Sequence, residues 1–346
     1  MQAVVKPAPG PGAAWATVPE RAPLAGEAQL QLVAAGICGT DLHILKWNAW
    51  AAGRVHPPRV LGHEMAGLVL AVGEGVETPR VGDLVGVESH LVDLTCPQCL
   101  RGDYQVCENT LILGVDVDGV FAERVIVPAR NCRVAPPTLD PAVVAFQEPM
   151  GNAVHAAAQG DLKGQVVVVT GCGPIGCAAV GIARAEGARL VVAVDRVPGR
   201  LKIAEQMGAD ALVDTSSGDL VASLRAACRG EADVVLEMSG HPLLIQGALA
   251  AIRPGGWISL LGLGDSELTL DLSSQVVMRG ITLFGITGRR QFETWDQTGA
   301  YLSSGRVDVS PILTHRVSLL DFERAFELAG AAEVGKVVLY PPEGGW

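Results

Sequence analysis

Short apolar segments in the first part of the chain alternate with polar positions on a period of two. The clearest segment, residues 28–33, reads AQLQLV, and the segments are bounded by Gly, Pro or Asp. This period is typical of strands that bury one face and expose the other. We therefore expect a small, barrel-like β domain, whose further strands lie at 67–72, 83–87 and 121–127.

The pattern changes after residue 145. Residues 165–170 (QVVVVT) carry an unbroken apolar run, an Ala-rich helical segment follows at 177–186, and a second apolar strand covers 190–194. Strands that alternate with helices predict an α/β domain with a parallel sheet. Further strands are expected at 211–213, 233–237, 257–262 and 281–285, and the tail at 321–329 (helix) and 336–340 (strand) is expected to return to the first domain.

Length and composition favour two globular domains. The chain has 346 residues, of which 49% are hydrophobic and 18% charged, and we place one domain at 1–150 and 293–346 and the other at 151–292. The net charge of −11 argues against nucleic acid and anionic membranes as partners. Because the N-terminus lacks an apolar signal core and the eight cysteines suggest a reducing compartment, we expect a cytoplasmic protein.

One candidate metal site lies in the segments CGTDLH and GHEMAG. Cys38, His63 and Glu64 offer a thiolate, an imidazole and a carboxylate, and a catalytic zinc needs three such ligands and one exchangeable position. In an extended backbone the adjacent His63 and Glu64 point opposite ways, so we do not expect both to bind tightly at once. Glu148 precedes Pro149 and is expected at a helix start, where it could reach a metal or simply favour the helix dipole. The alternative to a metal site is an ordinary buried Cys and His.

A second candidate site has the spacing D-x2-C-x2-C-x7-C. A closed structural zinc needs four ligands, and three cysteines leave one position short. A carboxylate three residues before the first cysteine restores the fourth ligand, although oxygen is a harder donor than sulfur. The alternative is an empty or partly oxidised lobe. The four residues are Asp93, Cys96, Cys99 and Cys107.

The second domain carries the pattern of a dinucleotide site. Gly171, Gly173 and Gly176 form G-x-G-x-x-G between the strand and the Ala-rich helix, and Asp195 ends the next strand. Such glycines let the backbone approach a pyrophosphate at a helix N-terminus, and the acid accepts hydrogen bonds from ribose hydroxyls while repelling a 2′-phosphate. We predict NAD rather than NADP, although Arg200 could hold a phosphate. Turns at 262–264 and 286–287 follow later strands and are candidates for the nicotinamide half, or ordinary turns.

Taken in order, these parts resemble the zinc-containing medium-chain alcohol dehydrogenase family along nearly the whole chain. The resemblance rests on GICGTDLHILKWNAW, LGHEMAG, ESH, QEPMGNAVH and VMRGITLFGITGRR. It implies a GroES-like β-rich catalytic domain, a Rossmann-type doubly wound NAD domain, two zinc ions per chain and a homotetramer. Within the family these segments are most similar to members that oxidise C3 of L-threonine, giving 2-amino-3-oxobutanoate.

The resemblance also implies roles for single residues. Cys38, His63 and Glu64 would bind the catalytic zinc with Glu148 beside it, and the zinc would act on the substrate hydroxyl as a Lewis acid. Thr40 and His43 match proton-relay positions, and the alternative is a structural role as a capping Thr and a surface His. Two positions depart from the family, which has a fourth Cys at Asp93 and is expected to have an acid at Asn48. The NAD-binding positions are Ile175, Asp195, Arg200, Gly262, Leu263, Gly264, Ile286 and Thr287.

Three alternatives to this function stay open. A zinc polyol dehydrogenase of the sorbitol or butanediol type would share nearly all the motifs. A zinc-free quinone reductase relative is disfavoured by the Cys38, His63 and Glu64 set. A non-catalytic protein that kept the fold would be favoured by loss of Cys38 or His63, and neither residue is lost.

Overall fold

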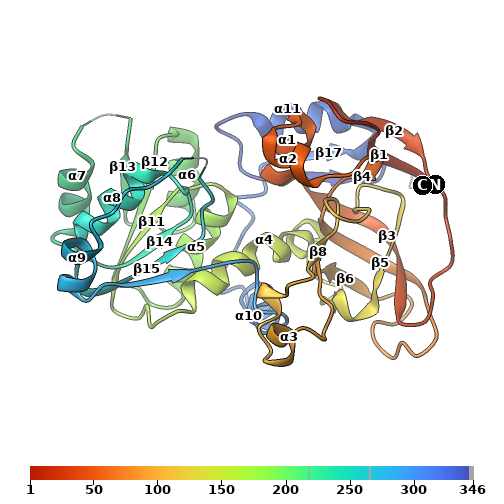
Figure 1. The fold of residues 1–346 in the computed structure, drawn as a ribbon, viewed down its shortest axis with the longest axis horizontal. Coiled ribbons are helices and arrows are strands. Elements are labelled where there is room, and N and C mark those ends of the chain that lie inside the picture. The colour runs from red at the N-terminus through yellow and green to blue at the C-terminus, as the bar shows by residue number, and fades with distance from the viewer. Residues whose placement is uncertain (217, 265, 343–346) are drawn as a thin grey trace. The chain divides into compact units, whose positions relative to one another are not determined.

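The chain folds around two separate β-sheet cores, one largely antiparallel and one parallel (Figure 1). The computed structural model describes residues 1–216, 218–264 and 266–342. One unit comprises residues 1–148 and those from Leu313 onward, and the other comprises Pro149–Ile312. The second boundary therefore falls after 312 rather than after 292. Helix α10 (Glu293–Ser303) belongs to the second unit, where the Tyr301 hydroxyl donates to Glu186 Oε1 at 2.8 Å.

The first unit is organised around strand β3 (Glu27–Gly36). The strand alternates buried and half-buried residues from Ala28 to Val33, as the period of two predicts, and Leu30 and Leu32 enter the core. It pairs antiparallel with β5, β9 and β18, so the tail of the chain lies in the same sheet. In the described residues this sheet has seven strands: β10 (Cys132–Val134), β6 (Leu84–Val87), β5 (Glu64–Val72), β3, β18 (Val337–Tyr340) and β17 (His315–Ser318), with β9 (Arg124–Pro128) beside β3.

Smaller elements complete the first unit. One short sheet has the order β2 (Ala14–Thr17), β1 (Gln2–Lys6) and β4 (Arg59–Val60), and another pairs β7 (His90–Leu91) with β8 (Leu111–Ile112). Its helices are α1 (Gly39–Lys46), α2 (Ala49–Arg54), α3 (Pro97–Leu100), α11 (Phe322–Gly330) and the 3₁₀ turns η1 (Tyr104–Val106), η2 (Ala129–Asn131) and η4 (Leu319–Asp321). The sequence pattern did not predict α1–α3, because helices of eight residues or fewer show too few turns for a period to stand out.

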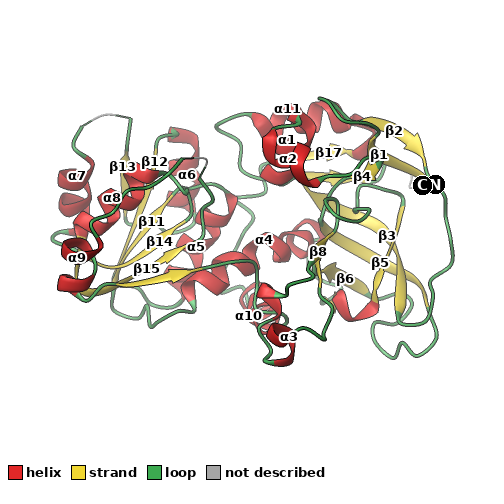
Figure 2. Cartoon of the chain, viewed as in Figure 1, coloured by secondary structure: helices red, strands yellow, loops and turns green. Residues whose placement is uncertain are grey.

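The second unit is a doubly wound parallel sheet, drawn with yellow strands and red helices in Figure 2. Val166 and Val168 pack with Leu224 of α7 (Leu220–Cys228) and Leu249 of α8 (Pro242–Ala251). Right-handed crossovers place α5 (Pro174–Ala185) and α6 (Pro198–Gln206) on the other face. The strand order in its described part is β13 (Ala211–Asp214), β12 (Leu190–Asp195), β11 (Val166–Thr170), β14 (Ala232–Glu237), β15 (Ile252–Leu260) and β16 (Thr282–Gly285). The helices are α5 (Pro174–Ala185), α6 (Pro198–Gln206), α7 (Leu220–Cys228), α8 (Pro242–Ala251), α9 (Leu272–Gln275), η3 (Val277–Arg279) and α10.

The predicted helix start at Glu148–Pro149 is wrong. Helix α4 runs from Pro141 to Ala157, with Pro149 inside it. A proline lacks the N–H that would bond to the carbonyl four residues earlier, which usually ends a helix; here the helix continues, and Glu148 lies in its middle. Among the described residues, no helix combines the length and apolar character needed to cross a bilayer.

Candidate active site

The side chains of Cys38, His63 and Glu64 converge in the first unit. Their three ligand atoms all lie within 4.8 Å of one another. The pairing of β3 with β5 explains this proximity, since it sets Gly36 opposite Glu64 and so brings the residues that follow β3 next to the residues that begin β5. His63 precedes β5 and lies outside any strand. Its ligand atom and that of Glu64 both reach the cluster, so the two side chains do not face opposite ways as an extended backbone would place them.

Two glycines make room for this cluster. A Cβ on Gly36 would lie 1.9 Å from Glu64 Oε2, so a larger residue there would displace the carboxylate. Gly62 has φ +87°, a backbone conformation that L side chains rarely adopt, and its Cβ would meet the Phe121 ring at 2.3 Å. The glycines before the two ligand segments thus set the positions of Glu64 and His63.

Asp41 is a buried carboxylate that lies close to His63. Its Oδ2 accepts from the Cys38 N–H at 2.9 Å and its Oδ1 from the Gly62 N–H at 3.2 Å, so it joins the two ligand segments. Burial raises the pKa of Asp41. Burial alone would lower the pKa of His63, but the charges of Asp41 and Cys38 outweigh it and raise that pKa well above its ordinary value. The negative charges around His63 therefore favour a positive charge at its imidazole, which is a proton in the metal-free enzyme.

Glu64 is paired with a lysine from the far end of the chain. Lys336 Nζ donates to Glu64 Oε1 at 2.7 Å, to Oε2 at 2.8 Å and to the Ile37 carbonyl at 3.0 Å. Burial alone would lower the pKa of Lys336, but Glu64 and Cys38 raise it. Glu148 lies outside the three-ligand group, and its Oε1 accepts from the Ser89 hydroxyl at 2.6 Å.

The cluster fits a zinc ion. It offers one thiolate, one imidazole and one carboxylate, the donor set of a catalytic zinc with an exchangeable position. The buried Nδ1 of His63 has no hydrogen bond within the described residues, and Asp41 Oδ1 lies 3.7 Å from it. Metal-binding histidines commonly direct their second nitrogen toward a carboxylate, and Asp41 occupies that position.

Thr40 and His43 lie one turn apart on α1. Residues three apart on a helix share a face. The Thr40 hydroxyl lies 3.8 Å from Cys38 Sγ, which donates to it, so this predicted relay residue is beside the cluster. His43 is exposed, and its ring lies against Trp50 and the Asn48 amide.

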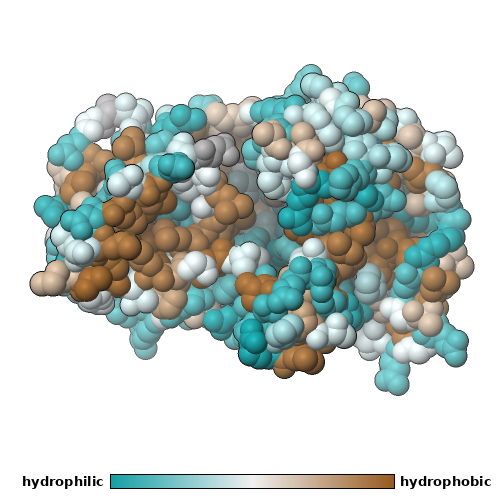
Figure 3. All heavy atoms as spheres, viewed as in Figure 1, coloured by the Kyte–Doolittle hydropathy of each residue, from teal (hydrophilic) through white to brown (hydrophobic). Residues whose placement is uncertain are grey.

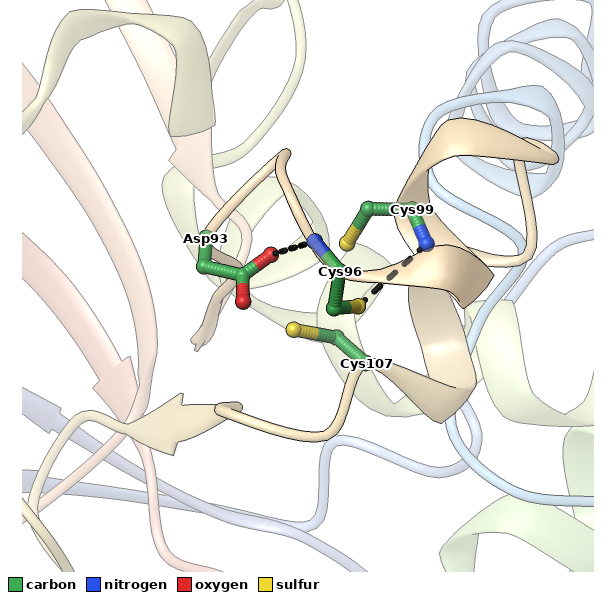
Figure 4. A group of neighbouring side chains, drawn as sticks. All are labelled: Asp93, Cys96, Cys99 and Cys107. Carbon is green, nitrogen blue, oxygen red and sulfur yellow. Dashed lines mark hydrogen bonds between the residues drawn. The ribbon is translucent and has the colours of Figure 1, made fainter.

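The second cluster forms as the spacing predicts. Figure 4 shows Asp93 in the loop before α3, Cys96 at the start of α3, Cys99 within it and Cys107 at the end of η1, and their ligand atoms lie within 4.8 Å of one another. Asp93 Oδ1 accepts from the Thr95 and Cys96 N–H groups at 2.8 and 3.0 Å, and Oδ2 accepts from Asn109 Nδ2 at 2.6 Å. These bonds lower the pKa of Asp93, with Asn109 as the largest cause. Because Oδ2 has one hydrogen bond, it keeps a lone pair for a metal.

The glycines of the second unit form the tight turn that leads into α5. Gly171 has φ +85°, and a Cβ on Gly176 would lie 1.8 Å from the Gly171 carbonyl oxygen, so only glycine allows this turn. A Cβ on Gly173 would meet nothing within 4 Å, which leaves open space at the N-terminus of α5. Asp195 joins the turn to the next strand, since its Oδ2 accepts from the Cys172 N–H at 2.7 Å and its Oδ1 from the Val197 N–H at 2.9 Å.

A cavity of about 1300 Å³ opens at this turn. Gly171, Gly173, Asp195 and Arg200 line it. Arg200 Nε is buried there without a hydrogen bond among the described residues. The other predicted cofactor positions do not line this cavity: Gly176 is buried against the Gly171 carbonyl, Ile175 is half-buried, Gly262 and Gly264 pack against Gly240, Leu263 and Thr287 are exposed and Ile286 is buried.

Comparison with known proteins agrees with this geometry. Residues 24–137 match the alcohol dehydrogenase GroES-like domain, and residues 174–304 match the zinc-binding dehydrogenase domain. The chain belongs to the zinc-binding alcohol dehydrogenase family. The predicted family, enzyme class and α/β fold class, with a GroES-like unit and a Rossmann-type unit, are thereby confirmed.

Members of this family are similar to the chain along nearly its whole length. An L-threonine 3-dehydrogenase from Symbiobacterium thermophilum is 47% identical over 99% of this chain and 98% of its own. One from Bacillus licheniformis is 44% identical over 99% of both. Among solved structures, a short chain alcohol dehydrogenase from Escherichia coli CFT073 with NADH has a TM-score of 0.88 and 28% identity over 98% of this chain and 99% of its own. A 2R,3R-butanediol dehydrogenase from Bacillus subtilis has a TM-score of 0.88 and 27% identity over 98% of this chain and 99% of its own.

Proposed function

We propose that this enzyme oxidises the C3 hydroxyl of L-threonine with NAD⁺ and gives 2-amino-3-oxobutanoate. The observation that carries the proposal is the 47% identity, along nearly both full chains, to a family member that is named for this reaction. The Cys38, His63 and Glu64 cluster and the glycine turn supply the two sites that the reaction needs.

Cys38 and His63 anchor the catalytic zinc in this proposal. Bound zinc would polarise the substrate hydroxyl as a Lewis acid. Glu64 has its negative charge balanced by Lys336, so Glu64 is a weaker ligand that can yield to substrate or water. Glu148 tunes the site electrostatically from outside the ligand group.

Thr40 and His43 carry the proton of the substrate hydroxyl away. The contact of Thr40 with the Cys38 thiol supports the first position, because a group that takes this proton must lie beside the metal ligands. The exposure of His43 supports the last position, where a side chain must exchange protons with water. From Thr40 the proton would pass through a ribose hydroxyl of NAD to His43.

Asp195 selects NAD over NADP in this proposal. Its two carboxylate oxygens each have one backbone hydrogen bond, which fixes the side chain and leaves lone pairs for the ribose hydroxyls. A 2′-phosphate at the same place would meet a buried negative charge. Arg200, whose Nε has no partner among the described residues, is the candidate cation for the pyrophosphate side of the cavity.

Each chain holds a second zinc at Asp93, Cys96, Cys99 and Cys107. Asn109 supports this site, because its hydrogen bond to Oδ2 orients the carboxylate as a single-oxygen ligand. Measuring the zinc content of three proteins tests the assignment: the parent enzyme, Asp93→Cys and Asp93→Ala. We expect two zinc ions in the parent, equal or slower zinc loss to a chelator in Asp93→Cys, and one zinc with lower stability in Asp93→Ala. A parent enzyme with a single zinc would contradict the assignment.

The enzyme assembles as a homotetramer in the cytoplasm in this proposal. Among the described residues, β16 pairs with β15 alone and forms an edge of the parallel sheet, and Figure 3 shows apolar surface over the neighbouring α9 and β15. Leu272, Val277 and Met278 are 56%, 71% and 82% exposed there. A strand edge with exposed apolar side chains is a typical surface for association with another copy. All eight cysteines are free, which is consistent with a reducing compartment.

A substrate panel tests the function. NADH absorbance would be followed with L-threonine, sorbitol and butane-2,3-diol at equal concentrations, with NAD⁺ and then NADP⁺. We expect the highest kcat/KM with L-threonine and NAD⁺. Higher kcat/KM with butane-2,3-diol would instead favour the alternative of a polyol dehydrogenase, an activity named for one structural neighbour.

A further inference from the structure

Asn48 holds the predicted relay residue His43 at two points. The Asn48 backbone N–H donates to the His43 carbonyl at 3.3 Å, and Asn48 Nδ2 lies 2.9 Å from His43 Nδ1. Trp47, between α1 and α2, has φ 54° and closes the turn that brings the two side chains together. The Trp50 ring contacts His43 edge-on, with centroids 6.4 Å apart. The ring of His43 is thus held by the residues that begin α2.

The amide of Asn48 has one orientation that satisfies its partners. Its Oδ1 accepts from the Ala51 N–H at 3.0 Å and so caps the N-terminus of α2. Exchanging Oδ1 and Nδ2 would set two N–H donors against each other at Ala51. The NH₂ group therefore faces His43, and His43 Nδ1 must accept its hydrogen bond. A neutral imidazole has one donor and one acceptor nitrogen, which assigns the ring proton to Nε2.

We infer that Asn48 is a positioning residue that fixes His43 in the Nε2–H tautomer. This inference rests on the relay role of His43 in the proposed function. In this tautomer Nε2 carries a proton and the Nδ1 lone pair is engaged by Asn48, so the ring has no free acceptor. To take the proton that leaves the substrate hydroxyl, the ring must first lose its bond to Asn48; Nδ1 then accepts the proton and passes it to water.

An aspartate at position 48 would reverse this arrangement. One carboxylate oxygen would still cap α2, since Asp is among the best capping residues. The other would accept a hydrogen bond from Nδ1–H, and Nε2 would then be free to accept the relay proton. In catalytic triads, placing Asn where Asp orients the histidine preserves geometry but lowers turnover about 10⁴-fold through the wrong tautomer. His43 is exposed and can turn toward water, so we expect a smaller gain of about tenfold on Asn48→Asp.

The test combines a spectrum with kinetics on the zinc-loaded enzyme. ¹⁵N-histidine labelling reports which nitrogen of each of the seven histidines is protonated, and a His43→Gln sample identifies the signals of His43. Parent, Asn48→Asp and Asn48→Ser are compared, because Ser caps α2 but is too short to reach the ring. We expect Nε2–H in the parent, Nδ1–H in Asn48→Asp, and a mixture in Asn48→Ser. We expect kcat for L-threonine to rise about tenfold in Asn48→Asp with KM nearly unchanged.

The outcomes separate this inference from the proposed function. A parent with Nδ1–H, or the same tautomer in parent and Asn48→Asp, overturns the inference whatever the kinetics show. A change of tautomer with unchanged kcat overturns the relay role of His43 and, with it, the catalytic part of the inference. If no variant oxidises L-threonine, the proposed function fails, and the spectra still decide whether Asn48 sets the tautomer.

Discussion

Removing Lys336 should destabilise the metal-free enzyme strongly. Lys336 and Glu64 form an ion pair whose side chains are 5% and 1% exposed, at 2.7 Å. Lys336→Met keeps an unbranched side chain of similar length, so the main change is the loss of the positive charge. The Glu64 carboxylate then stays buried without its lysine partner; burial already raises the pKa of Glu64, and the charge of Glu148 acts in the same direction.

The expected magnitude follows from the burial of both partners. Breaking a buried ion pair by removing one partner costs about 3–5 kcal/mol, whereas replacing both partners by neutral groups is often nearly neutral. In a unit of this size each kcal/mol lowers Tm by about 2–4 °C, so Lys336→Met should lose about 6–20 °C. The double variant Lys336→Met with Glu64→Gln should recover most of that loss. Zinc should reduce the effect of the single variant, because a bound cation again balances Glu64.

The assay is thermal and urea unfolding of four proteins, namely the parent, each single variant and the double variant. Each is measured after chelation and again after zinc is restored. Two results would refute the reasoning: a loss below about 1 kcal/mol in metal-free Lys336→Met, or a double variant no more stable than that single variant. Either would mean that Glu64 finds another partner or becomes protonated without cost.

Three further predictions concern the cofactor turn and the pH dependence. Gly176→Ala places a methyl group against the Gly171 carbonyl, so it should lower both Tm and NADH affinity. Gly173→Ala meets open space, so it should keep Tm and weaken only NADH binding. Melting curves and fluorescence titration with NADH measure the two effects, and an equal loss of Tm in the two variants would contradict the prediction. Asp195→Ala should shift the NAD⁺ over NADP⁺ preference by about 1–3 kcal/mol in kcat/KM, and an unchanged ratio excludes Asp195 as the selector. In the metal-free enzyme the pKa of His63 is raised, so the protonated imidazole contributes its full stabilisation below about pH 6.5 and loses it as pH rises through the raised pKa. The Tm difference between the parent and His63→Gln should therefore shrink toward high pH. A Tm difference that stays constant with pH would contradict this prediction.

Local spacing predicted the parts of the site that lie close together in the chain. The Asp93, Cys96, Cys99 and Cys107 group and the tight turn at Gly171–Gly176 form where their spacing indicated. These patterns succeed because a few residues of connecting chain limit where the side chains can lie. The same local reasoning failed at Glu148, because the packing of α4 overrides the tendency of Pro149 to end a helix.

Long-range partners had no signal in the sequence. Lys336 meets Glu64 only because β18 pairs with the end of β3, and the two residues are 272 positions apart. Asp41 reads as an ordinary helix acid until the loop before β5 covers it. Asn48 was recognised as a departure from the family, but its bond to His43 depends on the αL turn at Trp47, which the apolar pattern does not encode.

The most direct test of the account is zinc content measured beside L-threonine turnover in Cys38→Ser and Cys99→Ser. The account predicts that Cys38→Ser loses one zinc and all measurable NADH formation. It predicts that Cys99→Ser loses the other zinc and some stability but keeps turnover per folded enzyme, because its cluster is separate from the Cys38 group. Oxidation of L-threonine by Cys38→Ser at a rate near that of the parent would contradict the account.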